Sequence, residues 1–385
     1  MSHVSSRFAS FGSSVFTEIT AAARRAGAVD LGQGYPTWEG PDLVKQAAVD
    51  AIWEQSNQYP PPTGLPVLRE AIASRWKIDT GMEADPDTEI TVTSGCTEAL
   101  AATVLGLVEP GDEVVLIEPF YDSYPVCVSM AGARVRSVVL RPPDFAVPLD
   151  DLARVFNDMT KVIIVNSPHN PTGRVFSPEE LDGIADLCRR HDAIAVTDEV
   201  YEHMTYDTEF ARIASREGMW ERTVSLSSTG KTFSLTGWKT GWAIAPPHLT
   251  EAVRAAHQFL TYTVPNPMQW GTAAGLRADQ TYFDDLRTDY KRRRDHLAAG
   301  LGSVGFNVFL PQGTYFMLAD HTGFGTRTDV EFVRHLIEDI GVAAIPPSFF
   351  YTDPSDGADL VRFAFCKDDK TMDTALDRLQ EGLAE

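Results

Sequence analysis

The sequence predicts an α/β fold: a large domain with a mainly parallel seven-stranded sheet sandwiched by helices, and a smaller α+β domain. From about residue 40 to 270, short apolar runs rich in Val and Ile alternate with amphipathic stretches. That alternation is typical of a parallel sheet covered on both faces. After about residue 275 the pattern changes, and 385 residues exceed what one small core usually organises.

Seven apolar runs are the expected strands of the large domain. They span Glu89–Thr93, Glu113–Ile117, Val135–Leu140, Val162–Asn166, Ile194–Asp198, Thr223–Ser227 and Trp242–Ala245. Amphipathic stretches such as Glu98–Leu107 and Pro178–Arg190 are expected to form helices between several of them. The second begins after Ser177 and has Glu180 three residues later, which is a capping-box pattern.

The changed pattern after residue 275 predicts a small C-terminal α+β domain over 276–385, beside a large domain over 31–275. Its expected elements are a charged helix at about 281–301, strands at Asn307–Leu310 and Thr314–Leu318, a helix near 328–340, a strand at 359–365 and a final helix. Residues 1–30 are expected to form an N-terminal segment that packs with the small domain.

Composition narrows the class of protein. The net charge of -21 disfavours nucleic-acid binding, because an acidic surface repels phosphate backbones. The four cysteines are scattered without a C-x-x-C pair, so we expect no metal site and no disulfide framework; they are Cys96, Cys127, Cys188 and Cys366. No signal peptide is evident, and no apolar run approaches the ~20 residues of a membrane span. We therefore expect a soluble, cytoplasmic protein.

Polar residues follow the predicted strands, where the ligands of α/β sheets bind. The turn Ser94-Gly95-Cys96-Thr97 enters a helix, and the free N–H groups there suit a phosphate, although a plain strand-to-helix turn is an alternative. After the next strand, Tyr121 is placed to stack on a planar ring or simply to pack in the core. Asn170 either shapes a turn with its neighbouring prolines or donates a hydrogen bond to a phenolate-like oxygen.

Two further strand ends carry an acid and an amine. Asp198 ends an apolar strand, and a buried carboxylate there needs a partner such as a protonated pyridine nitrogen. Lys231 follows another strand as the candidate imine former, with Ser228 and Lys239 beside it for a phosphate. Together the strand ends offer a phosphate cup, a ring stacker, a phenolate donor, a carboxylate and a lysine. Those are the groups that pyridoxal 5'-phosphate (PLP) requires.

Three ordered motifs carry a resemblance to a known family. Asn166-Ser167-Pro168-His169-Asn170-Pro171-Thr172-Gly173 matches N-x-P-x-N-P-T-G, Asp198-Glu199-Val200-Tyr201 matches D-E-x-Y, and Ser228-Thr229-Gly230-Lys231 is followed by a cation, Lys239, eight residues on. Over nearly its whole length the chain resembles the class I/II aminotransferases of the fold-type I PLP superfamily. The domain over 31–275 would then be the PLP-binding domain.

The resemblance implies a role for each matching residue. Lys231, Asp198 and Tyr201 would be catalytic. The cofactor would be held by Gly95, Cys96, Thr97, Tyr121, Asn166, Asn170, Asp198, Tyr201, Ser228, Lys231, Lys239 and Tyr59. Tyr59 resembles the tyrosine that reaches the partner subunit's phosphate, which implies a homodimer with active sites at the interface. Arg362 resembles the arginine that clamps the substrate α-carboxylate beside Gly34 and Asn170, and a structural salt bridge is its alternative role.

Local sequence is most similar to a subgroup of kynurenine/glutamine transaminases, cysteine-conjugate β-lyases, methionine aminotransferases and N-succinyldiaminopimelate aminotransferases. The chain departs from the kynurenine enzymes at Phe16, where they have tryptophan, and at Tyr262-Thr263, where they have Phe-His. Aromatic residues suggest a lined side-chain pocket, with packing in the core as the alternative for some of them; they are Phe16, Tyr35, Tyr124, Tyr262 and Phe349. With no second arginine evident, a neutral or aromatic amino acid is favoured over aspartate.

The expected reaction moves the amino group of an L-amino acid to a 2-oxo acid through a Lys231 Schiff base. β-Elimination or a biosynthetic replacement would need the same Lys231 and Asp198, and N-succinyldiaminopimelate is an alternative donor. A non-catalytic PLP-binding regulator usually carries a fused DNA-binding domain, for which the ~30 residues before the catalytic pattern leave no room. A nicotinamide oxidoreductase is disfavoured because no G-x-G-x-x-G follows the strands.

Overall fold

The large sheet has seven strands in the order β2-β8-β7-β6-β5-β3-β4, which confirms the predicted α/β fold. The computed structural model describes residues 4–9, 11–12 and 14–383. Antiparallel pairing joins β8 to both of its neighbours, and the other pairs are parallel. Each predicted strand is present with its ends moved by no more than two residues. The strands are β2 (Ile90–Thr93), β3 (Glu113–Glu118), β4 (Arg134–Val139), β5 (Thr160–Asn166), β6 (Ile194–Asp198), β7 (Thr223–Ser228) and β8 (Gly241–Ile244).

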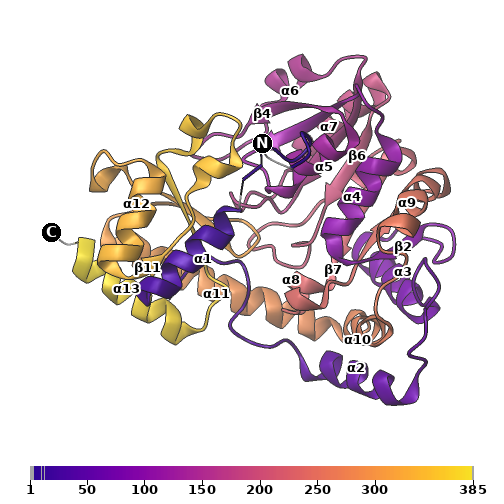
Figure 1. Ribbon diagram of the computed structural model, residues 1–385, viewed down its shortest axis with the longest axis horizontal. Helices are drawn as coiled ribbons and strands as arrows, with labels where there is room; N and C mark the ends of the chain where they lie inside the picture. Colours follow the sequence, from indigo (N-terminus) through magenta and orange to yellow (C-terminus); the bar gives the residue numbers. More distant parts are fainter. Residues whose placement is uncertain (1–3, 10, 13, 384–385) are drawn as a thin grey trace.

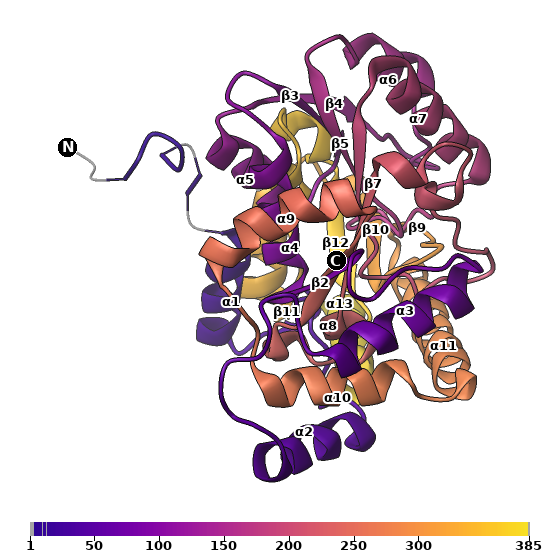
Figure 2. The ribbon, with the colours of Figure 1, turned by 90° about the vertical axis from the view of Figure 1, so that its right-hand side faces the viewer.

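Helices cover both faces of this sheet. Successive side chains of a strand point to opposite faces. In β3, Val114 and Leu116 therefore join one core cluster while Val115 and Ile117 join another. The first cluster includes α4 (Gly95–Leu107), α5 (Ser123–Ala131) and α9 (Pro247–Leu260); the second includes α6 (Leu149–Val155) and α7 (Pro178–His191). Figure 2 shows these two groups of helices on either side of the strands. Burial on both faces explains why the strands appear in sequence as continuous apolar runs.

The predicted capping box at the start of α7 is present. The Ser177 hydroxyl accepts the Glu180 N–H at 3.2 Å, and a Glu180 carboxylate oxygen accepts the Ser177 N–H at 2.6 Å. Glu180 also accepts the N–H of Val147 at 2.8 Å. The cap therefore satisfies helix N–H groups and ties α7 to the segment before α6.

The C-terminal part of the chain forms a second, antiparallel sheet in the order β12-β10-β9. The expected strand at Thr314–Leu318 begins two residues later, because Thr314 has a φ of 65° and so cannot continue an extended strand. The expected helix at 328–340 ends in a π-helical turn. The elements are α11 (Gln280–Val304), β9 (Asn307–Phe309), β10 (Phe316–Asp320), α12 (Asp329–His335), the π-helix η5 (Leu336–Ile340), β12 (Leu360–Ala364) and α13 (Asp369–Leu383).

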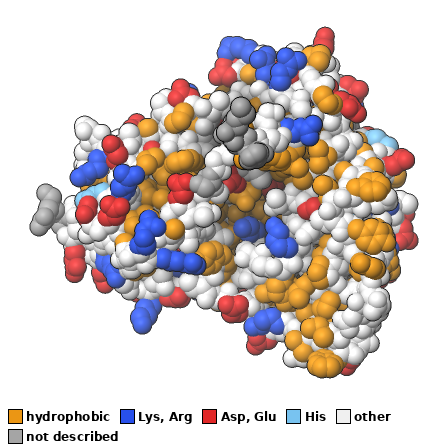
Figure 3. All heavy atoms as spheres, viewed as in Figure 1, with side chains coloured by type: hydrophobic (Ala, Val, Ile, Leu, Met, Phe, Trp, Pro, Cys, Tyr) orange, Lys and Arg blue, Asp and Glu red, His pale blue; other side chains and the backbone are white. Residues whose placement is uncertain are grey.

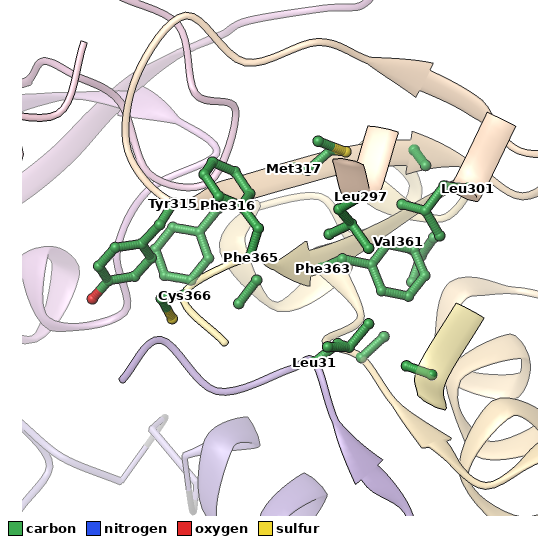
Figure 4. Packing of buried hydrophobic residues seen from close by; sticks show 14 of the residues in the cluster. Leu31, Leu297, Leu301, Tyr315, Phe316, Met317, Val361, Phe363, Phe365 and Cys366 are labelled. Atoms are coloured by element: carbon green, nitrogen blue, oxygen red, sulfur yellow. The ribbon is translucent and has the colours of Figure 1, made fainter. Parts of the chain in front are cut away.

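Residues 15–30 lie with this C-terminal part. Helix α1 (Val15–Ala26) contacts η5, and β1 (Val29–Asp30) pairs in parallel with β11 (Val342–Ala343), a pairing that the sequence analysis did not anticipate. In Figure 1 the indigo α1 lies beside the yellow α13. Figure 4 shows Leu31 meeting side chains of β10 and β12, together with Leu297 and Leu301 of α11. The domain limits at residues 30 and 275 stay a prediction.

The remaining helices pack near the edge of the large sheet that β2 forms. In Figure 1, α2 lies below α10, and α10 contacts both α2 and α3. These remaining helices are α2 (Asp42–Glu54), α3 (Pro66–Thr80), the short α8 (Thr229–Thr232) and α10 (Asn266–Leu276). The single-turn 3₁₀ helices are η1 (Ile213–Ser215), η2 (Trp220–Arg222), η3 (Thr236–Trp238), η4 (Thr322–Phe324), η6 (Pro347–Phe350) and η7 (Pro354–Gly357). Across the described residues, every helix is too short or too polar to span a membrane.

Candidate active site

A cavity of about 290 Å³ lies at the carboxyl ends of three central strands. Its lining includes the last residues of β5, β6 and β7, namely Asn166, Asp198 and Ser228. Figure 3 shows this face of the molecule hollowed between its two parts, with Lys and Arg side chains inside the hollow. The predicted site residues that line the cavity are Phe16, Gly34, Tyr35, Gly95, Cys96, Thr97, Tyr121, Tyr124, Asn166, Asn170, Asp198, Tyr201, Ser228, Lys231, Lys239 and Arg362.

Asp198 is the only carboxylate among the described lining residues, and the surrounding protein holds it firmly. Its Oδ2 accepts the Tyr124 hydroxyl at 2.7 Å, and its Oδ1 lies 3.5 Å from the Cys96 Sγ. Its own carbonyl accepts the Asn166 side-chain amide at 2.8 Å. Burial raises the pKa of Asp198, while the Tyr124 hydrogen bond lowers it.

Lys231 lies in α8, directly after β7, and lines the cavity. The amine lies 5.7 Å from the ring centroid of Tyr201 and 5.6 Å from that of Tyr315. Desolvation lowers the pKa of Lys231, and the charges of Arg362 and Lys239 act in the same direction. A lower pKa leaves more of the amine unprotonated, which a nucleophile or general base requires.

The turn between β2 and α4 is shaped by Gly95, which has a φ of 75°. A Cβ at this position would lie 3.2 Å from Cε and 3.3 Å from Nζ of Lys239. Glycine therefore lets the Lys239 ammonium group lie against the start of α4. The first N–H groups of this 13-residue helix, including those of Cys96 and Thr97, need partners from outside the helix. An ammonium beside a helix N-terminus is suited to an anion such as phosphate.

Arg362 comes from β12 and is 1% exposed. Its Nη1 donates to the Asn170 Oδ1 at 3.2 Å and its Nη2 donates to the Gly32 carbonyl at 3.0 Å, whereas its buried Nε has no partner among the residues that the structure describes. Burial lowers the pKa of Arg362 to about 10. Within the described residues no carboxylate forms an ion pair with it, so the alternative role in a structural salt bridge is not supported. An unpaired buried cation favours an anionic ligand.

Two aromatic residues position Gly34: Phe316, the first residue of β10, and Tyr315, which directly precedes that strand. The Tyr315 hydroxyl donates to the Gly34 carbonyl at 2.6 Å, and a Cβ on Gly34 would lie 2.5 Å from Cζ of Phe316. The Phe316 ring centroid lies 4.0 Å from the centre of the Arg362 guanidinium. Sequence reasoning missed Phe316 as a lining residue, because an apolar position in a short strand does not show which face it occupies.

Three predicted residues do not line the cavity. Tyr59 and Tyr262 pack edge to face, with centroids 5.7 Å apart, and both are exposed. Phe349 is also exposed, although Phe350 beside it is buried near Phe16. The predicted roles of Tyr59 and Tyr262 would therefore need a second chain that brings them to a cavity.

The fold and the cavity place a lysine amine at the strand ends of an α/β sheet, beside groups suited to an anionic ligand. The chain matches the family model "Aminotransferase class I and II" over residues 26–379, and it belongs to that family. Aminotransferases of this family depend on PLP, act on amino acids and 2-oxo acids, and are generally dimeric.

The relatives agree with this assignment. A probable N-succinyldiaminopimelate aminotransferase of Mycobacterium tuberculosis is 48% identical and covers 97% of both chains. The methionine aminotransferase of Escherichia coli is 36% identical over 98% of this chain and 97% of its own. The solved structure of the M. tuberculosis enzyme superimposes with a TM-score of 0.95 at 47% identity, covering 98% of this chain and 99% of that one. This chain is therefore an aminotransferase, as the motifs predicted.

Proposed function

We propose that this aminotransferase binds PLP in the cavity, with the Lys231 amine and the Asp198 carboxylate at opposite ends of the cofactor. The observation that carries the proposal is the charge arrangement of the cavity. Among its described lining residues, three cations (Lys231, Lys239 and Arg362) are accompanied by the single carboxylate of Asp198. Such a lining favours a ligand that has an anionic group and a protonated ring nitrogen.

The lining residues fit the parts of PLP. The amides of Gly95, Cys96 and Thr97, with Ser228 and Lys239, would hold the phosphate; Tyr121 would stack on the ring; and Asn166, Asn170 and Tyr201 would act at its phenolic side. Bound PLP supplies an aldehyde and an electron-withdrawing pyridinium ring. Arg362 would grip the substrate α-carboxylate and so direct its Cα–H towards the Lys231 amine, which would remove and return that proton.

We propose a neutral or aromatic side chain for the amino donor. Phe16, Tyr35 and Tyr124 add aromatic surface to the lining, and the described lining residues offer no second arginine for a distal carboxylate. A second candidate donor is N-succinyldiaminopimelate, because the M. tuberculosis enzyme of that name shares 48% identity over nearly the full length.

A half-reaction screen distinguishes the donors. Protein reconstituted with PLP is mixed with single amino acids, and loss of the visible cofactor absorbance is followed without any oxo acid. Methionine, glutamine, kynurenine, N-succinyl-L,L-diaminopimelate and aspartate form the panel, and aspartate is expected to be slowest. Preference for aspartate would reject the proposed pocket. Release of ammonia and pyruvate from a cysteine conjugate would instead indicate a β-lyase.

Replacement of Lys231 tests the cofactor assignment. Lys231→Ala is expected to abolish transamination and the visible absorbance of reconstituted protein, because Lys239, the other lysine among the described lining residues, is assigned to the phosphate. Turnover and an absorption spectrum are measured on the same preparation. Full turnover in this variant would contradict the proposal.

We further propose a cytoplasmic homodimer with active sites at the subunit interface. Support comes from exposed aromatic side chains: Trp53 of α2 and Tyr59 are each 83% exposed, and Phe259 of α9 is 84% exposed. Figure 3 shows hydrophobic side chains gathered over the part of the molecule where α2 lies in Figure 1. A second copy would cover them and would bring Tyr59 to the partner's phosphate. The four free cysteines suit a reducing compartment.

A further inference from the structure

Tyr124 does not simply add an aromatic ring to the cavity. Its hydroxyl donates to the Asp198 Oδ2 at 2.7 Å, and the side chains of both residues are buried, at 4% and 8% exposed. A charge-assisted hydrogen bond of this length is among the stronger ones in proteins. The motifs that identify the family include Asp198 but not this donor.

The surroundings of Asp198 show how much depends on that hydroxyl. The Oδ1 atom has only longer contacts, with the Cys96 Sγ at 3.5 Å and the Val200 N–H at 3.4 Å. The positive charge of Lys231, in α8, lowers the pKa of Asp198 without a hydrogen bond to it among the described contacts. Burial raises the pKa values of Tyr124 and Cys96 well above their ordinary values, so both remain protonated donors. Tyr124 therefore supplies the one short hydrogen bond among the described contacts of the carboxylate oxygens.

The turn between β3 and α5 also positions the Tyr121 ring. The Tyr124 N–H donates to the Tyr121 carbonyl at 3.0 Å, and the two rings meet edge to face with centroids 5.9 Å apart. Tyr121 is the residue proposed to stack on the ring of PLP. The β3–α5 turn thus couples the position of the stacking ring to the orientation of the carboxylate.

We propose that Tyr124 is a positioning residue: its hydroxyl orients the Asp198 carboxylate and keeps it ionised to pair with a protonated ring nitrogen. This inference rests on the proposed function, because PLP supplies that nitrogen. Without the donor, a buried carboxylate takes up a proton more readily and pairs less well with a cationic ring.

The first test compares two ligands in the apoprotein. Tyr124→Phe is expected to weaken PLP binding by roughly tenfold or more, as for loss of a hydrogen bond to a charged group. It should not weaken binding of 1-deazapyridoxal 5'-phosphate, which has no ring nitrogen. Tyr351→Phe is the matched control, because it removes a buried tyrosine hydroxyl that has no hydrogen-bond partner in the described part of the chain. Equal weakening for both ligands, or for neither, would overturn the inference.

The second test needs no cofactor. The carboxyl signal of Asp198 in apoprotein is titrated by infrared or ¹³C spectroscopy and assigned with Asp198→Asn. Tyr124→Phe should raise the pKa of Asp198, and 3-fluorotyrosine at position 124, a stronger donor of nearly the same shape, should lower it. The fluorinated protein also serves if the phenylalanine variant does not fold. Unchanged titration curves would reject the role of Tyr124, whereas wild-type protein that fails to bind PLP would reject the proposed function instead.

Discussion

Arg362 illustrates how one residue combines packing with chemistry. Its guanidinium lies between the rings of Phe16, Phe316 and Phe350, with centroid distances of 5.2, 4.0 and 5.3 Å. Cation–π contacts of this kind offset part of the cost of burying the charge. The planar group is held edge-on by Asn170 and Gly32, so that its remaining N–H groups are available for a carboxylate.

This geometry makes Arg362→Lys a demanding substitution. Lysine keeps the charge but loses the two-pronged geometry and the stacking. We expect kcat/KM for the amino donor to fall by roughly a hundredfold, about 3 kcal/mol of transition-state stabilisation. PLP affinity should not change, because Arg362 is not among the proposed cofactor contacts. Unchanged kcat/KM would argue against the carboxylate role.

At the scale of elements, the β2–α4 turn depends on a glycine. Gly95→Ala combines backbone strain, of about 1 kcal/mol, with a Cβ pressed against Lys239. Gly81, which follows the last residue of α3, has a similar φ of 73°, but a Cβ added there would meet no atom of the described residues within 4 Å. Both alanine variants should lose the stability that corresponds to backbone strain, as measured in urea, whereas only Gly95→Ala, which displaces the Lys239 side chain, should weaken PLP binding. Equal PLP affinity in the two variants would contradict a phosphate cup at Gly95.

His257 links the first turns of α4 to the loop that precedes α3. In α9, His257 places Nδ1 2.9 Å from a Glu98 carboxylate oxygen and Nε2 2.8 Å from the Pro62 carbonyl. Burial lowers the pKa of His257, but these acceptors raise it by more, so the net shift is upward. Two acceptors on one ring are best satisfied by the doubly protonated form.

The upward shift fixes the sign of a pH effect. The stabilisation from His257 is complete below the unfolded-state pKa of about 6.5, and it is lost as pH rises through the higher folded-state pKa. Wild-type protein should therefore lose unfolding free energy on that rise more steeply than His257→Gln does, as measured by urea unfolding across the range. His296→Gln, which alters an exposed histidine beside Asp373, is the control. If the unfolding free energy changed with pH equally steeply in wild type and in His257→Gln, His257 would not contribute the pH-dependent stabilisation.

At the scale of the whole molecule, the exposed aromatic surface around Trp53 predicts assembly. Sedimentation should give twice the 42.3 kDa chain mass, and Trp53→Glu should shift the equilibrium towards monomer, because it puts a charge into a surface that another chain would cover. Activity should then fall on dilution, since Tyr59 would no longer reach a partner. A fully active monomer would contradict the interface site.

The sequence predicted the local motifs of the site and the strands of the fold, but not the contacts between distant segments. The motifs around Asn170, Asp198 and Lys231 identified the family, because each is a short run of neighbouring residues at the end of a strand. The β1–β11 pairing and the inward face of Phe316 were not predictable, since they depend on which distant segments meet. The hydrogen bond from Tyr124 to Asp198 was missed for the same reason: 74 residues separate donor and acceptor.

The sequence alone determined the class of enzyme and the succession of its strands along the chain, because apolar periodicity and local motifs are properties of neighbouring residues. Tertiary structure decided which residues share the cavity. Arg362 from β12 and Gly34, which follows β1, line the same cavity as Lys231 only after both parts of the chain have packed. Their contacts are set by burial across long sequence separations, and no local pattern encodes them.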